Sequence, residues 1–335
     1  MRSKSYLVTG GTGFLGAALV RRLVKEGHRV RVLDDNSRGS ATRLTDIAAN
    51  IEMIDGDVRD PAAVSRAVKG VEGVCHLAFV NGTEFFYSKP ELVLEVGVKG
   101  MVNVLDACIA HGVGELVLAS SSEVYQTPPV VPTDERVPMS IPDPLNPRYS
   151  YAGAKLISEL MTINYARKHF HRTLIFRPHN VYGPEMGWEH VLPQLALRVR
   201  GLLKAHPKDP LPLPIQGSGK ESRSFVYIDD FTDGLMRMIE AGEHMGIYNI
   251  GTTEEVTIAE VAKLVAKAFG RTAEIVPGPL QAGGTPRRCP DITRLAALGY
   301  APRVNLQAGV PRLVEWYDRN AHLAPRRAEP AGARP

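Results

Sequence analysis

The sequence predicts an α/β protein built on a doubly wound parallel sheet, with a smaller and mostly C-terminal α/β domain beside it. Three observations support this fold class. Short β-branched runs alternate with longer amphipathic stretches up to about residue 125, which is the pattern of consecutive βαβ units. A glycine-rich segment directly follows the first run and opens the first amphipathic stretch. The chain of 335 residues is long enough for about two domains of roughly 150 residues.

The first half of the chain is predicted to supply most of the sheet. Its apolar runs, interpreted as buried strands, lie at residues 6–9, 30–33, 51–54, 74–77 and 116–119, with a sixth at 174–177. Apolar residues at helical spacing predict helices at 15–26, 61–69, 96–111 and about 150–169. Gly27 and Gly112 stand where glycine commonly ends a helix. Strands and helices therefore alternate as a parallel sheet requires.

Regular alternation ends in the second half. Prolines between Pro128 and Pro147 predict a long loop that crosses the top of the sheet as a lid or substrate wall. Further prolines surround a helix at 192–203 and mark a second domain, to which a helix at 258–269 also belongs. Residues 225–228, a helix from Asp230, and residues 248–250 are expected to return to the sheet. The expected division is 1–177 with returning segments at about 223–252, then 178–222 and 253–321, and a disordered tail at 322–335.

Composition excludes several classes of protein. Hydrophobic residues make up 44% and charged residues 23% of the chain, as in ordinary globular proteins. The net charge is only +4, with scattered lysines and arginines, so we expect no nucleic-acid partner. We expect neither a signal segment nor a membrane span. Cys75, Cys108 and Cys289 form no CxxC pair, which favours a reducing, cytoplasmic setting, and no metal-ligand spacing occurs.

The glycine-rich segment predicts a dinucleotide site of the Rossmann type. Gly10, Gly13 and Gly16, with Phe14 and Leu15 between the last two, follow the first strand and open a helix. This arrangement lets the backbone approach a pyrophosphate at a helix N-terminus. Eighteen residues after Gly16, Asp34 is placed to accept hydrogen bonds from the ribose hydroxyls and to repel a 2′-phosphate. We therefore expect NAD rather than NADP, although Arg38 lies nearby.

Two acidic residues follow the third strand. Asp57 is placed to meet the adenine amine, whereas Asp60 is equally well explained as a helix N-cap. A buried histidine, His76, ends the fourth strand beside Cys75 and is interpreted as a packing residue. The expected cofactor site is thus formed at the ends of the first three predicted strands.

Tyr151 and Lys155 form a candidate catalytic pair. They are four residues apart on a predicted helix and therefore lie on one face, about one turn apart. A lysine ammonium near a phenol favours the phenolate and lowers the tyrosine pKa toward the working pH, as a general base for a sugar hydroxyl requires. The segment from Ser120 to Tyr125 follows the fifth strand at the sheet edge where ligands bind.

These motifs together resemble the extended short-chain dehydrogenase/reductase superfamily, in particular the NAD-dependent nucleotide-sugar epimerases and dehydratases. The resemblance runs from about residue 7 to 300 and includes GGTGFLG, GDVRD, SSSEVY, YAGAK, RPHNVYGP, RSFVY and RRCPD. It implies that Ser121, Tyr151 and Lys155 form a triad that acts at C4 of the sugar. It adds Val58, Leu77, Ala78 and Lys155 to the cofactor site. It assigns Ser122, Asn180, Arg223 and one of Arg287 or Arg288 to a nucleotide-diphosphate sugar, and it implies a homodimer.

The reaction depends mainly on the residue pair Ser122 and Glu123. By resemblance, simple 4-epimerases carry a small residue at position 123, and 4,6-dehydratases carry an Asp-Glu pair. Ser-Glu resembles UDP-glucuronate decarboxylases, as does the segment that begins at Arg288. Residues 177–184 resemble epimerases instead, and residues 185–190 fit none of these patterns.

We rank 4-epimerase first, then decarboxylase, then dehydratase. Two other classes stay open. One is a nucleotide-sensing module without turnover, and the other is a dehydrogenase of steroid-like or flavonoid-like alcohols.

Overall fold

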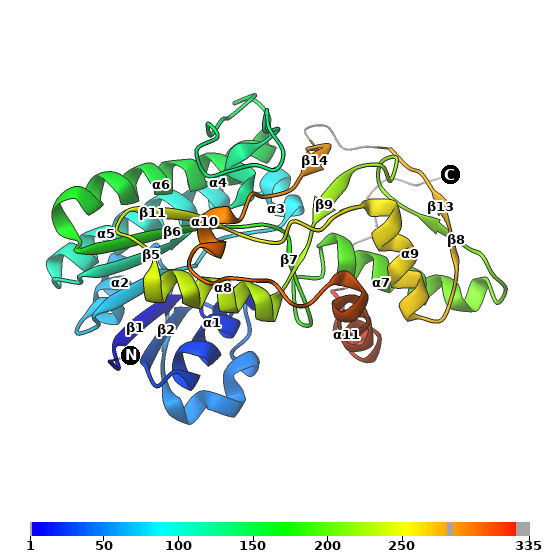
Figure 1. Cartoon of the computed structure of the whole chain (residues 1–335). Coiled ribbons are helices and arrows are strands. Elements are labelled where there is room, and N and C mark those ends of the chain that lie inside the picture. Colours follow the sequence, from blue (N-terminus) through cyan, green and yellow to red (C-terminus); the bar gives the residue numbers. More distant parts are fainter. Residues whose placement is uncertain (1, 280–283, 326–335) are drawn as a thin grey trace.

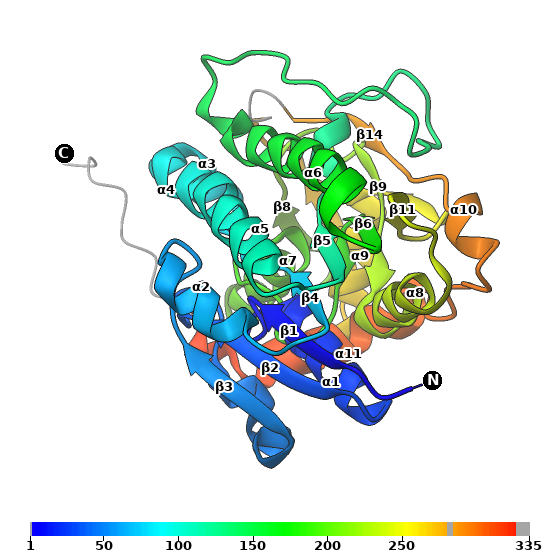
Figure 2. The same ribbon diagram turned by 90° about the vertical axis from the view of Figure 1, so that its left-hand side faces the viewer.

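The computed structural model describes residues 2–279 and 284–325, and its centre is a seven-stranded sheet (Figures 1 and 2). The strand order is β11-β6-β5-β4-β1-β2-β3, and all neighbouring strands are parallel. The strands are β1 (Ser5–Thr9), β2 (Arg29–Asp34), β3 (Ile51–Asp55), β4 (Gly73–His76), β5 (Glu115–Ala119), β6 (Arg172–Pro178) and β11 (Gly246–Ile250). The predicted fold class and these strands are confirmed, including the return of residues 248–250 to the sheet.

Helices cover both faces of this sheet (Figure 2). Side chains alternate across β1, so that Tyr6 and Val8 join one core while Leu7 joins the other. The first core lies under α1 (Phe14–Lys25) and α8 (Ile228–Ala241), and the second lies under α2 (Pro61–Val68), α5 (Gly100–Ala110) and α6 (Ser150–His169). Gly27 and Gly112 follow helices with φ of +82° and +66°, a conformation in which glycine avoids the Cβ clash. Both predicted caps are confirmed.

Residues 225–228 do not return to the sheet, so that prediction is wrong. The strand β9 (Ser222–Ser224) pairs instead with β12 (Glu255–Thr257) and β14 (Arg287–Arg288), and β10 (Val226–Tyr227) pairs with β7 (Val181–Tyr182). The physical reason is packing, because Phe225 and Tyr227 are buried in the core of the smaller lobe. The edge of β6 is already taken by β11. Helix α8 consequently begins at Ile228, two residues before the predicted start.

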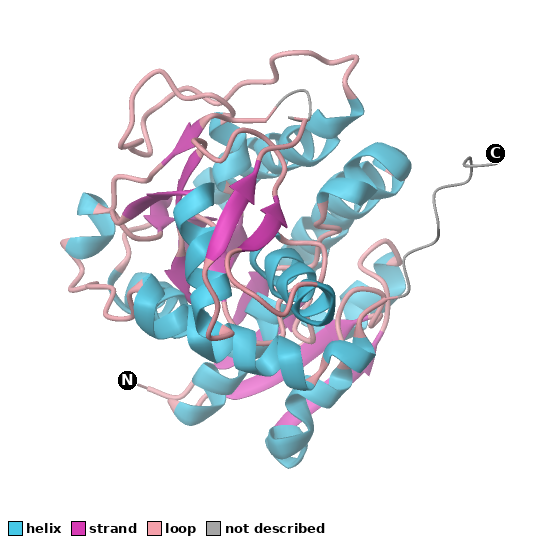
Figure 3. Ribbon diagram, turned by 90° about the vertical axis from the view of Figure 1, so that its right-hand side faces the viewer, coloured by secondary structure: helices cyan, strands magenta, loops and turns pink. Residues whose placement is uncertain are grey.

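The smaller lobe has its own hydrophobic core (Figures 1 and 3). Its helices are α7 (Val191–Ala205), α9 (Ile258–Ala268) and α11 (Leu306–Arg319), which pack with the parallel pair β8 (Leu211–Pro214) and β13 (Ala273–Val276). The predicted helices at 192–203 and 258–269 are confirmed. Neither the strands β8 and β13 nor the helix α11 was predicted individually from the sequence.

Short helical segments fill several connections. They are η1 (Ala41–Asn50), α3 (Thr83–Ser88), α4 (Pro90–Leu94), η2 (Glu95–Lys99), η3 (Ser122–Tyr125), η4 (Pro147–Tyr149), α10 (Thr293–Ala296) and η5 (Ala321–Leu323). The last of these occupies the start of the predicted disordered tail, whose residues 326–335 lie outside the described part of the chain. Among the described helices, none has the length and apolar character needed to cross a membrane.

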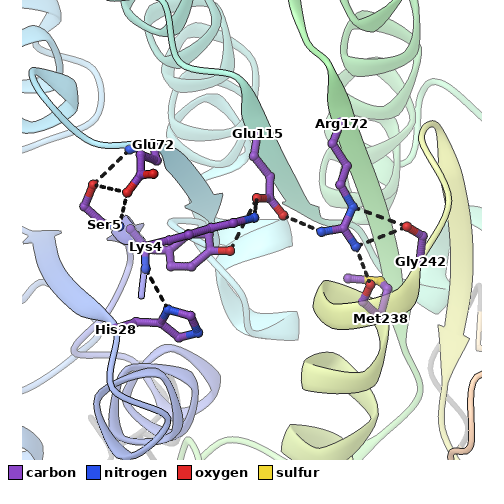
Figure 4. A network of polar contacts seen from close by, with 9 residues as sticks. Lys4, Ser5, His28, Glu72, Glu115, Arg172, Met238 and Gly242 are labelled. Carbon is purple, nitrogen blue, oxygen red and sulfur yellow. Dashed lines mark hydrogen bonds and ion pairs between the residues drawn. The ribbon is translucent and has the colours of Figure 1, made fainter. Parts of the chain in front are cut away.

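A buried ion cluster ties the amino ends of the strands together (Figure 4). The Glu115 carboxylate, which is 1% exposed, accepts hydrogen bonds from Lys4 Nζ at 2.7 Å and Arg172 Nη1 at 2.9 Å. The hydroxyl of Tyr6 donates to the same carboxylate at 3.3 Å. These residues stand at the beginnings of β1, β5 and β6. The cluster therefore fixes the sheet at the edge opposite to the one where ligands bind in such folds.

Candidate active site

A cavity of about 390 Å³ lies at the carboxyl edge of the sheet. The order of strands reverses between β1 and β4, and ligands of doubly wound sheets bind at this switch point. Every residue predicted to bind the cofactor lines the cavity: Gly10, Gly13, Phe14, Leu15, Gly16, Asp34, Asp57, Val58, Leu77, Ala78 and Lys155. The four predicted catalytic residues Ser121, Glu123, Tyr151 and Lys155 line it as well. The predicted cofactor-binding residues and the predicted catalytic residues thus line the same cavity.

The glycine turn leaves no space for side chains. A Cβ on Gly10 would lie 2.6 Å from Ala78 N, and one on Gly16 would lie 2.1 Å from Gly10 O. Gly10 also has φ of +71°, which L-residues rarely adopt. Helix α1 starts after Gly13 without a side-chain cap, and the residues of its first turn line the cavity. The turn therefore fits an anionic diphosphate.

The acidic residues of the cofactor region differ in their partners. Asp34 is buried and accepts hydrogen bonds from Thr12 N and Asn36 N, each at 2.9 Å. Its remaining lone pairs are available to ribose hydroxyls. Arg59 donates to Asp57 at 2.6 and 2.8 Å, and although burial opposes it, this contact holds the Asp57 pKa below its ordinary value. Asp60 caps α2 by accepting from Ala62 N at 2.9 Å, so the N-cap interpretation is confirmed.

Tyr151 and Lys155 share the buried face of α6. Tyr151 lies against Phe79 and Phe86, with ring centroids 5.0 and 4.8 Å away. The ammonium of Lys155 donates to Ala119 O at 2.6 Å and stands 3.7 Å from the centroid of Phe79. The predicted juxtaposition on one helix face is thus confirmed.

The predicted lowering of the Tyr151 pKa is wrong for the protein without ligands. Burial raises the pKa of Tyr151 to about 12, although hydrogen bonding with Ser121 acts in the opposite direction. Burial also lowers the pKa of Lys155 to about 7. Because the same apolar surroundings disfavour both charged forms, desolvation outweighs the attraction that the spacing suggested.

Two serines complete the catalytic group at the end of β5. Ser121 Oγ accepts a hydrogen bond from Glu123 N at 3.1 Å and caps the short helix η3. Ser122 is buried and lines the same cavity. His76 lies behind this region, where its Nδ1 is 2.7 Å from Thr9 Oγ1 and burial lowers its pKa to about 3. His76 is therefore neutral, in agreement with a packing role.

Positive charge surrounds Glu123. Arg288 Nη1 donates to Glu123 Oε1 at 2.6 Å, and Arg148 Nη2 lies 4.0 Å from Glu123 Oε2. Although burial opposes it, the charge of Arg288 holds the pKa of Glu123 below its ordinary value, with further contributions from Arg148 and Arg223. The Nε atoms of Arg148 and Arg288 are buried without a hydrogen-bond partner. Of these arginines, Arg288 lines the cavity and Arg148 and Arg223 do not, so the ion pair of Arg288 with Glu123 is the charged contact at this end of the cavity.

The remaining predicted substrate residues divide into two groups. Asn180 lines the cavity, with φ of +41°, and its Nδ2 donates to Ser224 O at 2.9 Å. Arg223 does not line the cavity and donates to Ser222 O at 2.7 Å and Thr285 O at 2.6 Å. Burial and the charge of Arg288 lower the Arg223 pKa to about 10. In this structure its guanidinium is bonded to backbone carbonyls, because strand β9 directs it toward the 285–286 segment.

Arg287 and Arg288 face opposite ways on β14. Arg287 pairs with Glu255 at 2.8 Å on the surface, outside the cavity, whereas Arg288 lines the cavity. Successive strand residues alternate in direction, so only Arg288 of this pair faces the site. The Pro-rich loop does not line the cavity either. It holds the Arg288 segment from behind, since Thr133 exchanges backbone hydrogen bonds with Cys289 and Asp291 at 2.9 Å.

Three features of the site were not found from the sequence. Arg148 stands three residues before Tyr151, and its partner Glu123 is distant in sequence, so no local pattern distinguishes it from a surface arginine. Phe79 and Phe86 were also missed. Phe79 follows the end of β4 by three residues, which is a usable signal, whereas Phe86 lies in the separate helix α3. Finally, the segment 185–190 places Glu189 at the cavity wall.

Comparisons with known proteins agree with this geometry. The model of the NAD dependent epimerase/dehydratase family matches residues 6–251. UDP-glucuronic acid decarboxylase 2 of Arabidopsis thaliana is 33% identical over 92% of this chain and 67% of its own length. UDP-N-acetyl-alpha-D-glucosaminuronate decarboxylase of Bacillus cytotoxicus is 28% identical over 94% of this chain and 98% of its own. The NAD complex of the UDP-glucose 4-epimerase from Thermus thermophilus superposes with a TM-score of 0.81 at 29% identity, covering 94% of this chain and 99% of that chain.

Proposed function

Because the chain belongs to the NAD-dependent epimerase/dehydratase family, we propose that it is an NAD-dependent nucleotide-sugar decarboxylase. Its substrate class is a nucleoside-diphosphate sugar with a carboxylate at C6. The observation that carries this proposal is the Glu123–Arg288 ion pair at the sugar end of the cavity, with Arg148 beside it. Arg148 and Arg223 also act on the Glu123 carboxylate, although neither lines the cavity, so the charge around Glu123 is net positive, which favours an anionic sugar.

The glycine turn and the carboxylate of Asp34, which both line the cavity, fit NAD. The turn at Gly10 and Gly16 has no space for side chains and lies at the start of helix α1, where a diphosphate would bind, and Asp34 offers acceptors to the ribose at the end of β2. NAD supplies a hydride acceptor that takes the C4 hydrogen and later returns it. Lys155 is positioned to hold the nicotinamide ribose, since it lines the cavity and its bond to Ala119 O occupies only one of the three ammonium donors.

The other residues act on protons and charge. Tyr151 takes the proton of the C4 hydroxyl, and Ser121, which lines the cavity with Tyr151 and acts on its pKa, orients the reacting oxygen. Oxidation at C4 makes the sugar a β-keto acid. The C5–C6 bond then breaks, carbon dioxide leaves, and the electron pair moves into the C4 carbonyl, which Tyr151 and Ser121 stabilise by hydrogen bonds. Proton addition at C5 and reduction at C4 complete the cycle.

Decarboxylation is placed ahead of 4-epimerisation, which was ranked first from the sequence. An epimerase needs only rotation of the keto sugar and has no use for a charged pair near C5. Glu123 bonds a cavity arginine through its carboxylate, so it is not explained as a purely local structural carboxylate. The resemblance of residues 177–184 to epimerases keeps 4-epimerisation as the second candidate, since Asn180 of this segment lines the cavity although Arg177 does not.

The test is product mass. We would incubate the purified protein with UDP-glucuronate, UDP-N-acetylglucosaminuronate, UDP-glucose and dTDP-glucose, and analyse products by liquid chromatography and mass spectrometry. The expected result is loss of carbon dioxide from one of the two uronates. An isomer of unchanged mass identifies an epimerase, and loss of water identifies a dehydratase. The Tyr151→Phe variant serves as the inactive control.

The same proposal extends to the roles of the two lobes. Residues 1–177, with the returning part of 223–252, would hold NAD, while 178–222 and 253–321 would hold the nucleotide part of the substrate. Support comes from the two separate cores and from a cavity that residues of both lobes line. The segment 292–300 departs from this division, because Leu295 and Tyr300 are buried in the core of the large sheet.

We also propose a homodimer through α5 and α6. Ile109, Ile157 and Leu160 are large apolar side chains, each more than a third exposed on these helices, and such faces mark protein interfaces. Light scattering after gel filtration would distinguish a dimer from a monomer.

A further inference from the structure

Residues 185–190, which matched no known pattern in the sequence, connect the smaller lobe to the cofactor side of the cavity through two ion pairs. Glu189 pairs with Arg38, in the loop after β2. Glu185 lies 3.5 Å from Arg43 Nε, and Arg43 also donates to Thr12 O at 2.8 Å beside the glycine turn. The proposed function uses neither pair.

Arg38 stands at the ribose end of the cavity. It follows Asp34 by four residues in the same loop, and both residues line the cavity. Its Nη2 donates to Asn81 O at 2.7 Å and to Glu189, and its guanidinium lies 4.2 Å from the ring centroid of Phe85. Contacts from three other residues therefore hold the guanidinium in one place. Glu84 is a further acidic neighbour that acts on its charge.

The Glu189 carboxylate lies close to two glycines. A Cβ on Gly82 would lie 2.9 Å from Glu189 Oε1, and one on Gly187 would lie 2.9 Å from Glu189 Oε2. The carboxylate therefore passes between these two segments to reach Arg38.

We propose that Glu189 is a specificity residue for the cofactor, an inference that rests on the proposed NAD-dependent function. An arginine in the loop after the second strand is the group that can accept a 2′-phosphate in a dinucleotide fold. Here Glu189 neutralises that arginine and directs its donors away from the ribose. Asp34 then binds the free 2′-hydroxyl, and the 2′-phosphate of NADP meets two carboxylates, while Arg38 is paired with Glu189 and Arg43 with Glu185.

Direct binding tests the inference. Dissociation constants for NAD and NADP would be measured by isothermal titration calorimetry on the full chain after removal of copurified dinucleotide. Glu189→Gln keeps the shape but frees Arg38, so the preference for NAD over NADP should fall ~10-fold, the effect of about one charge-assisted hydrogen bond. Glu189→Gln combined with Arg38→Gln should restore the wild-type preference.

The matched control is Glu52→Gln, which changes a carboxylate that pairs with Arg31 on β2, and neither of these residues lines the cavity. It should leave the preference unchanged. An unchanged preference in Glu189→Gln, or an equal change in the affinity for both dinucleotides, would overturn the inference. The Glu189–Arg38 ion pair would then only connect the two lobes and would not select the cofactor. Failure of the wild-type protein to bind either dinucleotide would instead contradict the proposed function.

Discussion

Arg288 donates a 2.6 Å hydrogen bond to Glu123, from which it is separated by 165 residues in the sequence. Glu123 follows β5 of the large sheet, and Arg288 ends the two-residue strand β14 of the smaller lobe. The pair therefore joins the two lobes across the sugar end of the cavity. It also places a carboxylate and a guanidinium close to Tyr151, whose pKa both charges affect.

We expect Glu123→Gln and Arg288→Met each to lower turnover of the uronate substrate by ~10²-fold, because each removes a charge positioned near the reacting carbons. The double variant should be no slower than the worse single variant, since residues that act as a unit are not additive. Steady-state kinetics would measure this. Arg287→Met is the matched control, because Arg287 is paired on the surface with Glu255, and its turnover should stay near that of the wild type. Multiplicative losses in the double variant would contradict a joint role.

Tyr151→Phe should remove most turnover, by ~10²–10⁴-fold, because the positioned base for the C4 hydroxyl is lost. The ring contacts with Phe79 and Phe86 remain, so thermal unfolding and NAD binding should change little. Calorimetry of NAD binding, run beside the activity assay, separates the two effects. Near-normal turnover with intact binding would assign the proton transfer to another residue.

Lys155→Met should change the pH dependence of stability in the cofactor-free protein. Burial lowers the Lys155 pKa from 10.5 to about 7, so between these pH values the unfolded chain binds a proton that the folded chain does not. Stability of the wild type must then rise with pH across this window. The variant lacks this rise, so its stability relative to the wild type should be greatest at the acidic end of the window and smallest at the alkaline end.

Urea denaturation at several pH values would measure this difference. The variant also loses the hydrogen bond to Ala119 O, and this loss acts at every pH. The prediction therefore concerns how the stability difference changes with pH and not its absolute value. A stability difference that does not vary with pH would show that the Lys155 pKa is not lowered by burial.

The ion pair between Arg177 and Glu159 should matter for stability far more than surface pairs do. Their side chains are 2% and 0% exposed, with an N···O distance of 2.6 Å. Glu159→Gln leaves a buried guanidinium without its counter-charge, which costs ~3–5 kcal/mol of unfolding free energy. The control Asp318→Asn breaks a pair whose side chains are both 51% exposed, where ~0–1 kcal/mol is expected. Equal urea midpoints for the two variants would contradict this account.

Local chemistry explains how much could be predicted from the sequence. Glycines at Gly10 and Gly16, the cap at Asp60 and the helix that carries Tyr151 and Lys155 depend on contacts within a few residues or on one repeating period. Hydrophobic periodicity over the βαβ units was sufficient to place six strands and the helices between them. The sequence by itself therefore determined the sheet, the dinucleotide turn and the identity of the candidate catalytic pair.

Tertiary structure decided the features that depend on distant segments. Only the folded chain shows that Arg288 rather than Arg287 faces the cavity, that Arg223 bonds backbone carbonyls, and that residues 225–228 join the smaller lobe. The protonation of Tyr151 and Lys155 also depends on the folded chain, because burial raises the pKa of Tyr151, against the predicted direction, and lowers the pKa of Lys155. Charge pairing and desolvation act through space, and a sequence pattern carries neither the distance nor the burial that sets their strength.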